Sequence, residues 1–309
     1  MGGLGILSYQ ECAPHAYAAA SDSASEVLAP ILPGVEAVRD SKSQHDRCQE
    51  IFAERHAALL NSLPPIEQAL VSEAASPVGR MWLGIIPYSP ALKLSNACVS
   101  IALQIRTLTS GVGESCRTCR RRTDVLHFEC CGTGRGTLTY RHNGVQDAIA
   151  AAFRALPNAQ VQISPRMYGS FNRFHDIRLI GSARTGIANV DLDVTVVSLG
   201  STSARYSYEH LVDPLPDTAA PADIARHFAD LHLDSMAQAK RDNIPLATAN
   251  ATAALPFRPI VFSVGGLMER GTEAAFKEWK KAMKPWVYSK MMCDIAVSLL
   301  KSRASAFSL

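Results

Sequence analysis

The chain has 309 residues, 47% of them hydrophobic, and its 31 Lys and Arg residues exceed its 28 Asp and Glu residues by three. This length predicts about two domains, and the hydrophobic fraction argues against long disorder. No apolar window is long enough for a membrane span, and the start lacks the basic and apolar regions of a secretory signal. Eight cysteines without such a signal indicate metal binding or bystander thiols rather than a disulfide framework.

Residues 1–108 are expected to form helices. Residues 13–21 are rich in alanine, and residues 49–63 repeat apolar side chains at helical spacing up to Pro64 and Pro65. Another helix is predicted over 90–108, with Ser89 as its N-cap and Pro90 as its first residue. The region holds no catalytic constellation, so a helical bundle or a lid is the predicted role.

Residues 144–309 have the pattern of an α/β domain. Helices are predicted over 144–156, 223–242 and 271–303, the last one interrupted near Pro285, and strands over 159–163, 176–180, 190–197 and 257–264. The strand at 190–197 alternates and is rich in β-branched residues, and Asp223 is the predicted N-cap of the second helix. This order predicts a mixed sheet covered by helices.

Between these regions, residues 109–143 carry a cysteine–histidine cluster. Cys116, Cys119, His127 and Cys131 have the spacing C-x2-C-x7-H-x3-C, which suits a tetrahedral zinc site. Such a small segment cannot pack a core, so a structural zinc ion would supply its folding energy. Sequence alone does not decide whether Cys130 or Cys131 is the fourth ligand. The alternative is a set of buried or idle thiols.

Arginines concentrate around this cluster. Between residues 106 and 178 there are 11 arginines, no lysine and five acidic residues, which leaves a charge of +6. Guanidinium groups make forked contacts with phosphate, so this segment is either a nucleic-acid-facing surface or ordinary surface arginine. The candidate nucleic-acid contacts are Arg120, Arg121, Arg122, Arg141 and His142. The last two precede the helix predicted from residue 144, where a phosphate could bind, although His142 could instead make a structural hydrogen bond.

Two carboxylates and one lysine suggest phosphodiester chemistry. Asp176 opens one predicted strand, and Asp193 lies in the next, 17 residues later. Carboxylates on neighbouring strands can hold Mg²⁺, which activates water for attack on a phosphate. Lys240 is the only lysine between Lys93 and Lys277, and its ammonium could stabilise developing charge. Alternatively, the acids are strand-edge residues and the lysine lies on a solvated helix face.

Taken together, these features resemble the carboxy-terminal region of non-LTR retrotransposon polyproteins that carry a restriction-like endonuclease. Four features carry the resemblance: the zinc knuckle followed by Arg141-His142-Asn143, the strand opened by Asp176-Ile177, the strand of Asp193-Val194-Thr195, and Ala239-Lys240-Arg241 followed by Phe257-Arg258-Pro259 and Gly265-Gly266. The similarity covers residues 109–270 best. Residues 1–108 resemble the linker that follows the polymerase in such elements.

The resemblance implies a fold and an activity. The fold would be restriction-endonuclease-like, of the PD-(D/E)xK type, a mixed sheet flanked by helices over residues 144–309, after a helical region (1–108) and a zinc knuckle (109–143). The activity would be Mg²⁺-dependent nicking of target DNA, which releases a 3′ hydroxyl to prime reverse transcription. Asp176 and Asp193 would bind magnesium, and Lys240 would be the catalytic lysine, reaching in from a helix because Thr195 occupies the usual lysine position.

The resemblance also implies partners and a location. DNA, and possibly RNA, would be the partner, the location would be nuclear, and no membrane is involved. The chain has no Tyr/Phe-x-Asp-Asp polymerase motif, so reverse transcriptase activity is not expected. Two alternatives stay open: a catalytically inactive, zinc-containing module that binds nucleic acid, and a structural fragment with no nucleic-acid role. The sequence does not predict the oligomeric state or the target site.

Overall fold

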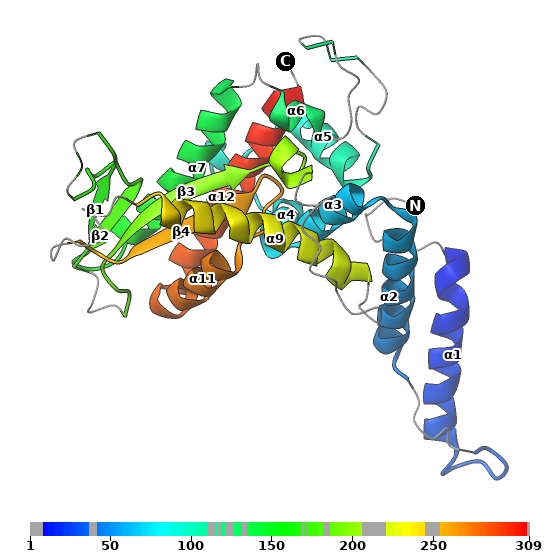
Figure 1. Ribbon diagram of the computed structural model, residues 1–309. Coiled ribbons are helices and arrows are strands. Elements are labelled where there is room, and N and C mark those ends of the chain that lie inside the picture. The colour runs from blue at the N-terminus through cyan, green and yellow to red at the C-terminus, as the bar shows by residue number, and fades with distance from the viewer. Residues whose placement is uncertain are drawn as a thin grey trace.

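The computed structural model describes residues 9–36, 42–109, 115–116, 119–120, 126–131, 135–168, 170, 172–181, 186–205, 221–244 and 254–307. Within these ranges the chain is a mixed α/β structure with one four-stranded sheet (Figure 1). None of the described helices combines the length and the apolar composition needed to cross a bilayer.

Helices dominate the first 108 residues. They are α1 (Tyr9–Leu28), α2 (Gln44–Ser62), α3 (Pro65–Ala75), α4 (Pro77–Met81), the 3-10 turns η1 (Trp82–Gly84) and η2 (Pro90–Leu92), and α5 (Asn96–Arg106). The helices predicted at 13–21 and 49–63 are confirmed. The first two helices pack side by side as a hairpin that projects from the rest of the molecule (Figure 1).

The helix predicted over 90–108 starts later than expected. Pro90 begins only the short turn η2, and the α-helix α5 begins at Asn96. The physical reason lies in the two candidate caps. Ser89 makes no capping hydrogen bond, whereas the side chain of Ser95 accepts one from the amide of Cys98 at 3.2 Å. The second serine therefore sets the helix start.

The sheet confirms the four predicted strands. They are β1 (Gln160–Ile163), β2 (Ile177–Ile180), β3 (Val190–Val197) and β4 (Phe257–Ser263), in the spatial order β1-β2-β3-β4. The first three strands are antiparallel neighbours, and β4 runs parallel to β3. Ile177 lies opposite Leu192, and the amide of Asp176 donates to the carbonyl of Leu192 at 3.0 Å. Asp176 is thereby placed beside Asp193 at one end of β2.

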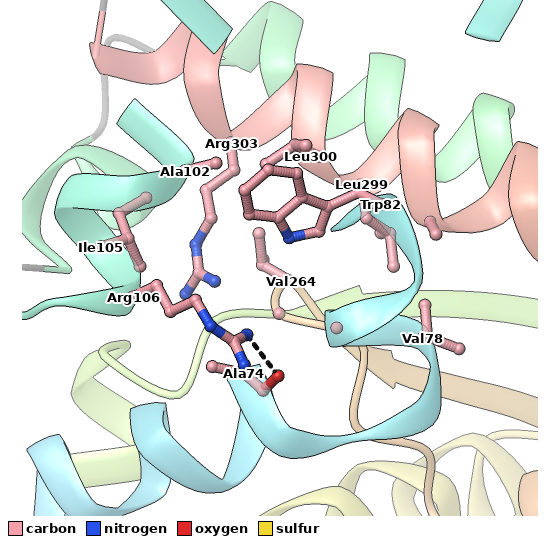
Figure 2. A pocket seen from close by; sticks show the side chains of 13 residues that line it. Ala74, Val78, Trp82, Ala102, Ile105, Arg106, Val264, Leu299, Leu300 and Arg303 are labelled. Atoms are coloured by element: carbon pink, nitrogen blue, oxygen red, sulfur yellow. Dashed lines mark hydrogen bonds between the residues drawn. The ribbon is translucent and has the colours of Figure 1, made fainter. Parts of the chain in front are cut away.

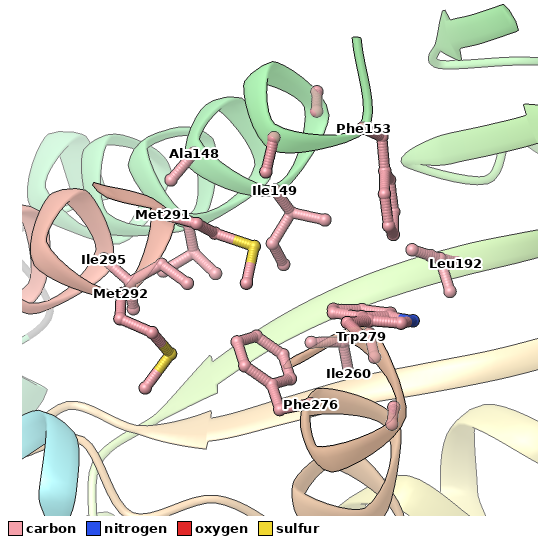
Figure 3. Packing of buried hydrophobic residues seen from close by; sticks show 14 of the residues in the cluster. Ala148, Ile149, Phe153, Leu192, Ile260, Phe276, Trp279, Met291, Met292 and Ile295 are labelled. Carbon is pink, nitrogen blue, oxygen red and sulfur yellow. The ribbon is translucent and has the colours of Figure 1, made fainter. Parts of the chain in front are cut away.

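Helices cover both faces of the sheet. Those after residue 126 are α6 (His127–Cys130), α7 (Arg135–Arg154), α9 (Pro221–Asp242), α11 (Arg270–Ala282) and α12 (Pro285–Phe307). On one face α7, α11 and α12 bury a core centred on Phe153, Phe276 and Trp279, with Leu192 of β3 beside them (Figure 3). On the other face α9 and α3 cover a smaller cluster that includes Leu233 and Val261. The period-2 pattern of the strands therefore serves two separate cores.

Helix α7 begins at Arg135, nine residues before the predicted start at Gly144. Arg141 and His142 consequently lie inside the helix and not at its N-terminus. Gly144 is unfavourable in a helix by propensity, but a side chain at this position would collide with Ser298 of α12. The glycine allows α7 and α12 to approach closely, and packing outweighs propensity. Helix α9 also starts earlier, at Pro221, so Asp223 lies in its first turn instead of capping it.

A buried group of charges joins the three predicted regions. Arg303 of α12 forms ion pairs with Glu73 of α3, at 2.9 Å, and with Glu129 of α6. The carboxylate of Glu73 also accepts the amide of Gly265 at 3.0 Å, and that of Glu129 accepts the Ser198 hydroxyl at 2.6 Å. All three charged side chains are buried. We call Glu73, Glu129 and Arg303 the sealed cluster.

A small cavity lies beside the sealed cluster. Arg303 of α12 and Arg106 of α5 both line it, and Arg106 donates a hydrogen bond to the carbonyl of Ala74 at 2.7 Å (Figure 2). Burial, with a smaller effect of Arg80, lowers the pKa of Arg106. The cavity volume is about 40 Å³, far below the roughly 300 Å³ of a typical ligand pocket. The cavity is therefore a packing feature and not a substrate site.

Candidate metal centre and active site

The cysteine–histidine cluster is assembled in the structure. One ligand atom from each of Cys116, Cys119, His127 and Cys131 lies within 4.8 Å of the others. The sulfurs of Cys116 and Cys131 are 3.8 Å apart, and the Cys119 sulfur is 3.2 Å from Nε2 of His127. Two sulfurs at the edge of a tetrahedral zinc site with bonds of about 2.3 Å would be about 3.8 Å apart. The donor set and its spacing therefore fit zinc.

The structure also decides between the two adjacent cysteines. Cys131 follows the short helix α6 and closes the cluster, whereas Cys130 is not among its members. The Cys130 thiol lies near Ser198, and burial raises its pKa. Cys131 is thus the fourth member of the candidate metal centre.

The predicted nucleic-acid contacts differ in their exposure and in their partners. Arg120 is exposed, with a positive φ of 58°, and Arg121 and Arg122 lie outside the described residues. Arg141 is only 3% exposed and donates to the carbonyl of Glu129 at 3.1 Å. Its expected contact with a phosphate is corrected, because a guanidinium buried under α6 cannot reach a ligand outside the protein. Arg141 instead fastens α7 to the knuckle.

The two predicted acids come together at one end of β2 and the middle of β3. Asp176 immediately precedes β2, Asp193 lies within β3, and their carboxyls share a hydrogen bond. The Oδ2 atom of Asp176 also accepts the amide of Val194 at 2.5 Å. Both side chains are partly accessible, at 19% and 15% exposure. Two carboxylates in contact with solvent provide the hard oxygen ligands that Mg²⁺ prefers.

Lys240 reaches this acid pair from α9. Its Nζ lies 2.9 Å from Oδ2 of Asp193, and the side chain keeps a third of its surface accessible. The lone lysine of this long arginine-rich stretch is therefore placed against the second acid, although Lys240 and Asp193 are 47 residues apart in the chain. We call Asp176, Asp193 and Lys240, together with His142, the open cluster.

His142 belongs to the open cluster and not to an exposed basic pair. Its Nε2 atom lies 3.2 Å from Oδ1 of Asp176. The expected phosphate contact of His142 rested on its place at a helix mouth, and the earlier start of α7 removes that basis. The hydrogen bond with Asp176, followed by the charge of that carboxylate, raises the pKa of His142. The structural alternative considered for His142 is thus the one that the geometry favours.

The electrostatics of the two acids are unequal. Burial and the neighbouring Asp176 raise the pKa of Asp193 to about 6, and Lys240 only partly opposes this shift. Burial also works against the charge on Asp176, but its hydrogen bonds from His142 and Asp193 outweigh that effect and lower its pKa. Strongly perturbed carboxyls with specific partners are typical of functional sites. The pKa values of the two neighbouring carboxyls are therefore shifted in opposite directions.

A third acid on the same strand has a structural role. Asp191 is buried, and Arg178 of β2 makes two hydrogen bonds to its carboxylate, at 2.7 and 2.8 Å. His175 lies 3.5 Å from the same carboxylate and packs near Phe257. Asp191 and Arg178 are opposite each other across the antiparallel pair, so their opposite charges could have indicated this contact.

Sequence reasoning overlooked Gln146. Its Nε2 donates to the main-chain carbonyl of Asp176 at 2.8 Å, and the residue is buried. Gln146 follows His142 by four residues, a spacing that puts both on one face of α7. That spacing would have indicated a common partner if the helix had been predicted to start before residue 142.

A comparison of the sequence with models of protein families and with curated proteins finds no match.

Proposed function

We propose that this protein is a metal-dependent DNA endonuclease of retroelement type, which nicks DNA and leaves a 3′ hydroxyl that can prime reverse transcription. The observation that carries the proposal is the convergence of Asp176, Asp193 and Lys240 from three separate elements into one accessible cluster. These are the three residues that the sequence indicates for phosphodiester chemistry. If these residue types had met by chance, the single lysine of α9 would have no reason to face Asp193.

In the proposed reaction, the chain's own residues have distinct tasks. Asp176 and Asp193 hold Mg²⁺, which when bound polarises the phosphate and lowers the pKa of a water molecule. Lys240 keeps a positive charge beside Asp193, where it can stabilise negative charge that develops on the scissile phosphate. His142 and the amide of Val194 keep the Asp176 carboxylate oriented.

The raised pKa of Asp193 supports the fit of a divalent cation. Burial and the charge of the neighbouring Asp176 raise this pKa, and a bound cation would relieve the repulsion between the two carboxylates. We further propose that the mixed sheet and its helices form a restriction-endonuclease-like fold. The knuckle would bind structural zinc and present Arg120 to DNA, and the location would be nuclear.

Plasmid nicking tests the proposal. The zinc-loaded full chain is incubated with supercoiled DNA with or without added Mg²⁺, and the open-circular product is quantified. We expect Mg²⁺-dependent nicking that falls at least about 100-fold in Asp176→Asn, Asp193→Asn and Lys240→Met, because each removes a charge from the site. Asp223→Asn, in the exposed first turn of α9, and Lys290→Met, on α12, are matched controls.

Two outcomes would contradict the endonuclease. Nicking that persists in Asp193→Asn would show that a contaminant or another site cleaves the DNA. Absence of nicking by the parent, with salt-dependent DNA binding retained, would favour the alternative of an inactive zinc-containing binding module.

A further inference from the structure

Helix α7 holds Asp176 at two points. His142 contacts the side chain, with Nε2 at 3.2 Å from Oδ1, and Gln146 donates to the main-chain carbonyl at 2.8 Å. The two residues are one helical turn apart on the same face of the helix. Side chain and backbone of one acid are therefore both held by a single rigid element.

The opposite side of Asp176 is held by β3. Its Oδ2 accepts the amide of Val194 at 2.5 Å, and its own amide donates to the carbonyl of Leu192 at 3.0 Å. His142 and the Val194 amide thus fix the direction of the two carboxylate oxygens, which keep further lone pairs for a cation. The side-chain partners of this carboxylate are His142 and Asp193, and Asp193 is itself a proposed metal ligand. His142 is therefore the partner that a substitution can remove without removing a ligand.

Helix α7 is itself immobilised. Val145 and Ile149 of this helix are completely buried in the larger core, and Gly144 lies directly against Ser298 of α12. The neighbouring Arg141 is bonded to the carbonyl of Glu129. A side chain delivered from such a helix has little freedom to follow a moving ligand, which is the requirement for holding a metal-binding carboxylate in one orientation.

We propose that His142 is a positioning residue for cation binding, which acts by orienting the Asp176 carboxylate and makes no contact with DNA. The inference rests on the proposed function for its metal site, but it assigns His142 a role outside the predicted catalytic set and different from the predicted phosphate contact. Partners that orient metal ligands typically change metal affinity by about 10- to 100-fold. The defect on removal should therefore appear in the cation requirement.

The test compares His142→Ala with His142→Gln, which keeps an N–H donor of similar reach. One readout needs no activity: the rise in melting temperature as Mg²⁺ is titrated into the zinc-loaded full chain, which reports cation affinity. The second is the Mg²⁺ concentration for half-maximal nicking, and the third is affinity for a DNA duplex without added Mg²⁺. His56→Ala, an exposed histidine of α2, is the matched control.

We expect His142→Ala to weaken Mg²⁺ binding about 10- to 100-fold, with DNA affinity in the absence of Mg²⁺ unchanged and most of the loss recovered in His142→Gln. Gln146→Ala should also weaken Mg²⁺ binding. Unchanged Mg²⁺ affinity in His142→Ala, or a loss of DNA affinity in the absence of Mg²⁺, would overturn the inference. If the parent binds Mg²⁺ through this site yet never nicks DNA, the positioning role stands and the proposed endonuclease fails; a parent that binds no Mg²⁺ overturns both.

Discussion

Two pairs of neighbouring carboxylates in this protein differ in their solvent exposure and in their cationic partners. In the sealed cluster, Glu73 and Glu129 are each 1% exposed and share Arg303, with further hydrogen bonds from Gly265 and Ser198. In the open cluster, Asp176 and Asp193 are partly accessible and are partnered by Lys240 and His142. One pair is closed to solvent, and the other faces it.

The cations explain the difference. Burial opposes the charge on Arg303, but Glu129 and Glu73 outweigh it and raise its pKa, so the guanidinium stays charged and joins both acids. The open cluster relies on a lysine, which makes a single point contact, and on a histidine, whose charge depends on pH. The pKa of Asp193 remains raised to about 6 in spite of them. The open pair is the one that a cation from solvent can reach, whereas the sealed pair, in which burial likewise raises the pKa of Glu129, serves the fold.

The largest effect is expected from breaking the sealed cluster. Arg303→Met keeps the length of the side chain but leaves two buried carboxylates without a cation, so we expect a loss of about 3–5 kcal/mol in the free energy of unfolding. Urea denaturation followed by circular dichroism measures it. Lys290→Met on the same helix, whose ion pair with Asp294 is exposed, should change stability by less than about 0.5 kcal/mol. Equal effects of the two substitutions would contradict the comparison.

Removing a charge from the open cluster should instead increase the free energy of unfolding. Without added Mg²⁺ at pH 7.5, Asp193→Asn is expected to stabilise the protein by about 1–3 kcal/mol, because a raised pKa means that the folded state disfavours the charged form. The native state binds the extra proton between about pH 6 and the ordinary aspartate pKa of 3.8, so this group adds stability to the parent as the pH falls through that window. The difference between variant and parent should vanish near pH 4.

Urea titrations of both proteins at several pH values check this prediction. The groups that face Asp193 are Asp176, Lys240 and, through Asp176, His142. A variant that is less stable than the parent at pH 7.5 would show that the Lys240 ion pair outweighs burial and the repulsion by Asp176.

Much of the open cluster could be predicted from the sequence, and none of the sealed cluster could. Alternation identified β3, and with it the position of Asp193, while the scarcity of lysine singled out Lys240. By contrast, Arg303 and Glu73 are 230 residues apart, and neither is unusual in its local context. Such a contact depends on how helices pack, which local periodicity does not contain.

The misplaced residues have a common cause. Arg141 and His142 were expected at a helix mouth because Gly144 looked like a boundary, whereas tight packing of α7 on α12 requires a glycine inside the helix. Because α7 starts at Arg135, these two adjacent residues lie within the helix and contact different partners. Arg141 donates to the carbonyl of Glu129 in the sealed cluster, and His142 contacts the carboxylate of Asp176 in the open cluster.

The smallest effect is expected from Cys130. Because Glu129 lies in α6 between the knuckle histidine and Cys131, the zinc site and the sealed cluster share one short helix. Cys131→Ser should abolish stoichiometric zinc binding, whereas Cys130→Ser should leave it unchanged. Zinc content by atomic emission on dialysed protein measures both. Loss of zinc in Cys130→Ser alone would reverse the ligand assignment.

The central claim is that the open cluster binds a divalent cation, and calorimetric titration of Mg²⁺ into the zinc-loaded full chain tests it most directly. At pH 6 the account predicts binding that is lost in Asp193→Asn. Its heat should depend on the ionisation enthalpy of the buffer, because the cation displaces the proton that Asp193 holds with a pKa of about 6. Binding of equal strength in the parent and in Asp193→Asn, or no binding by the parent, would contradict the account.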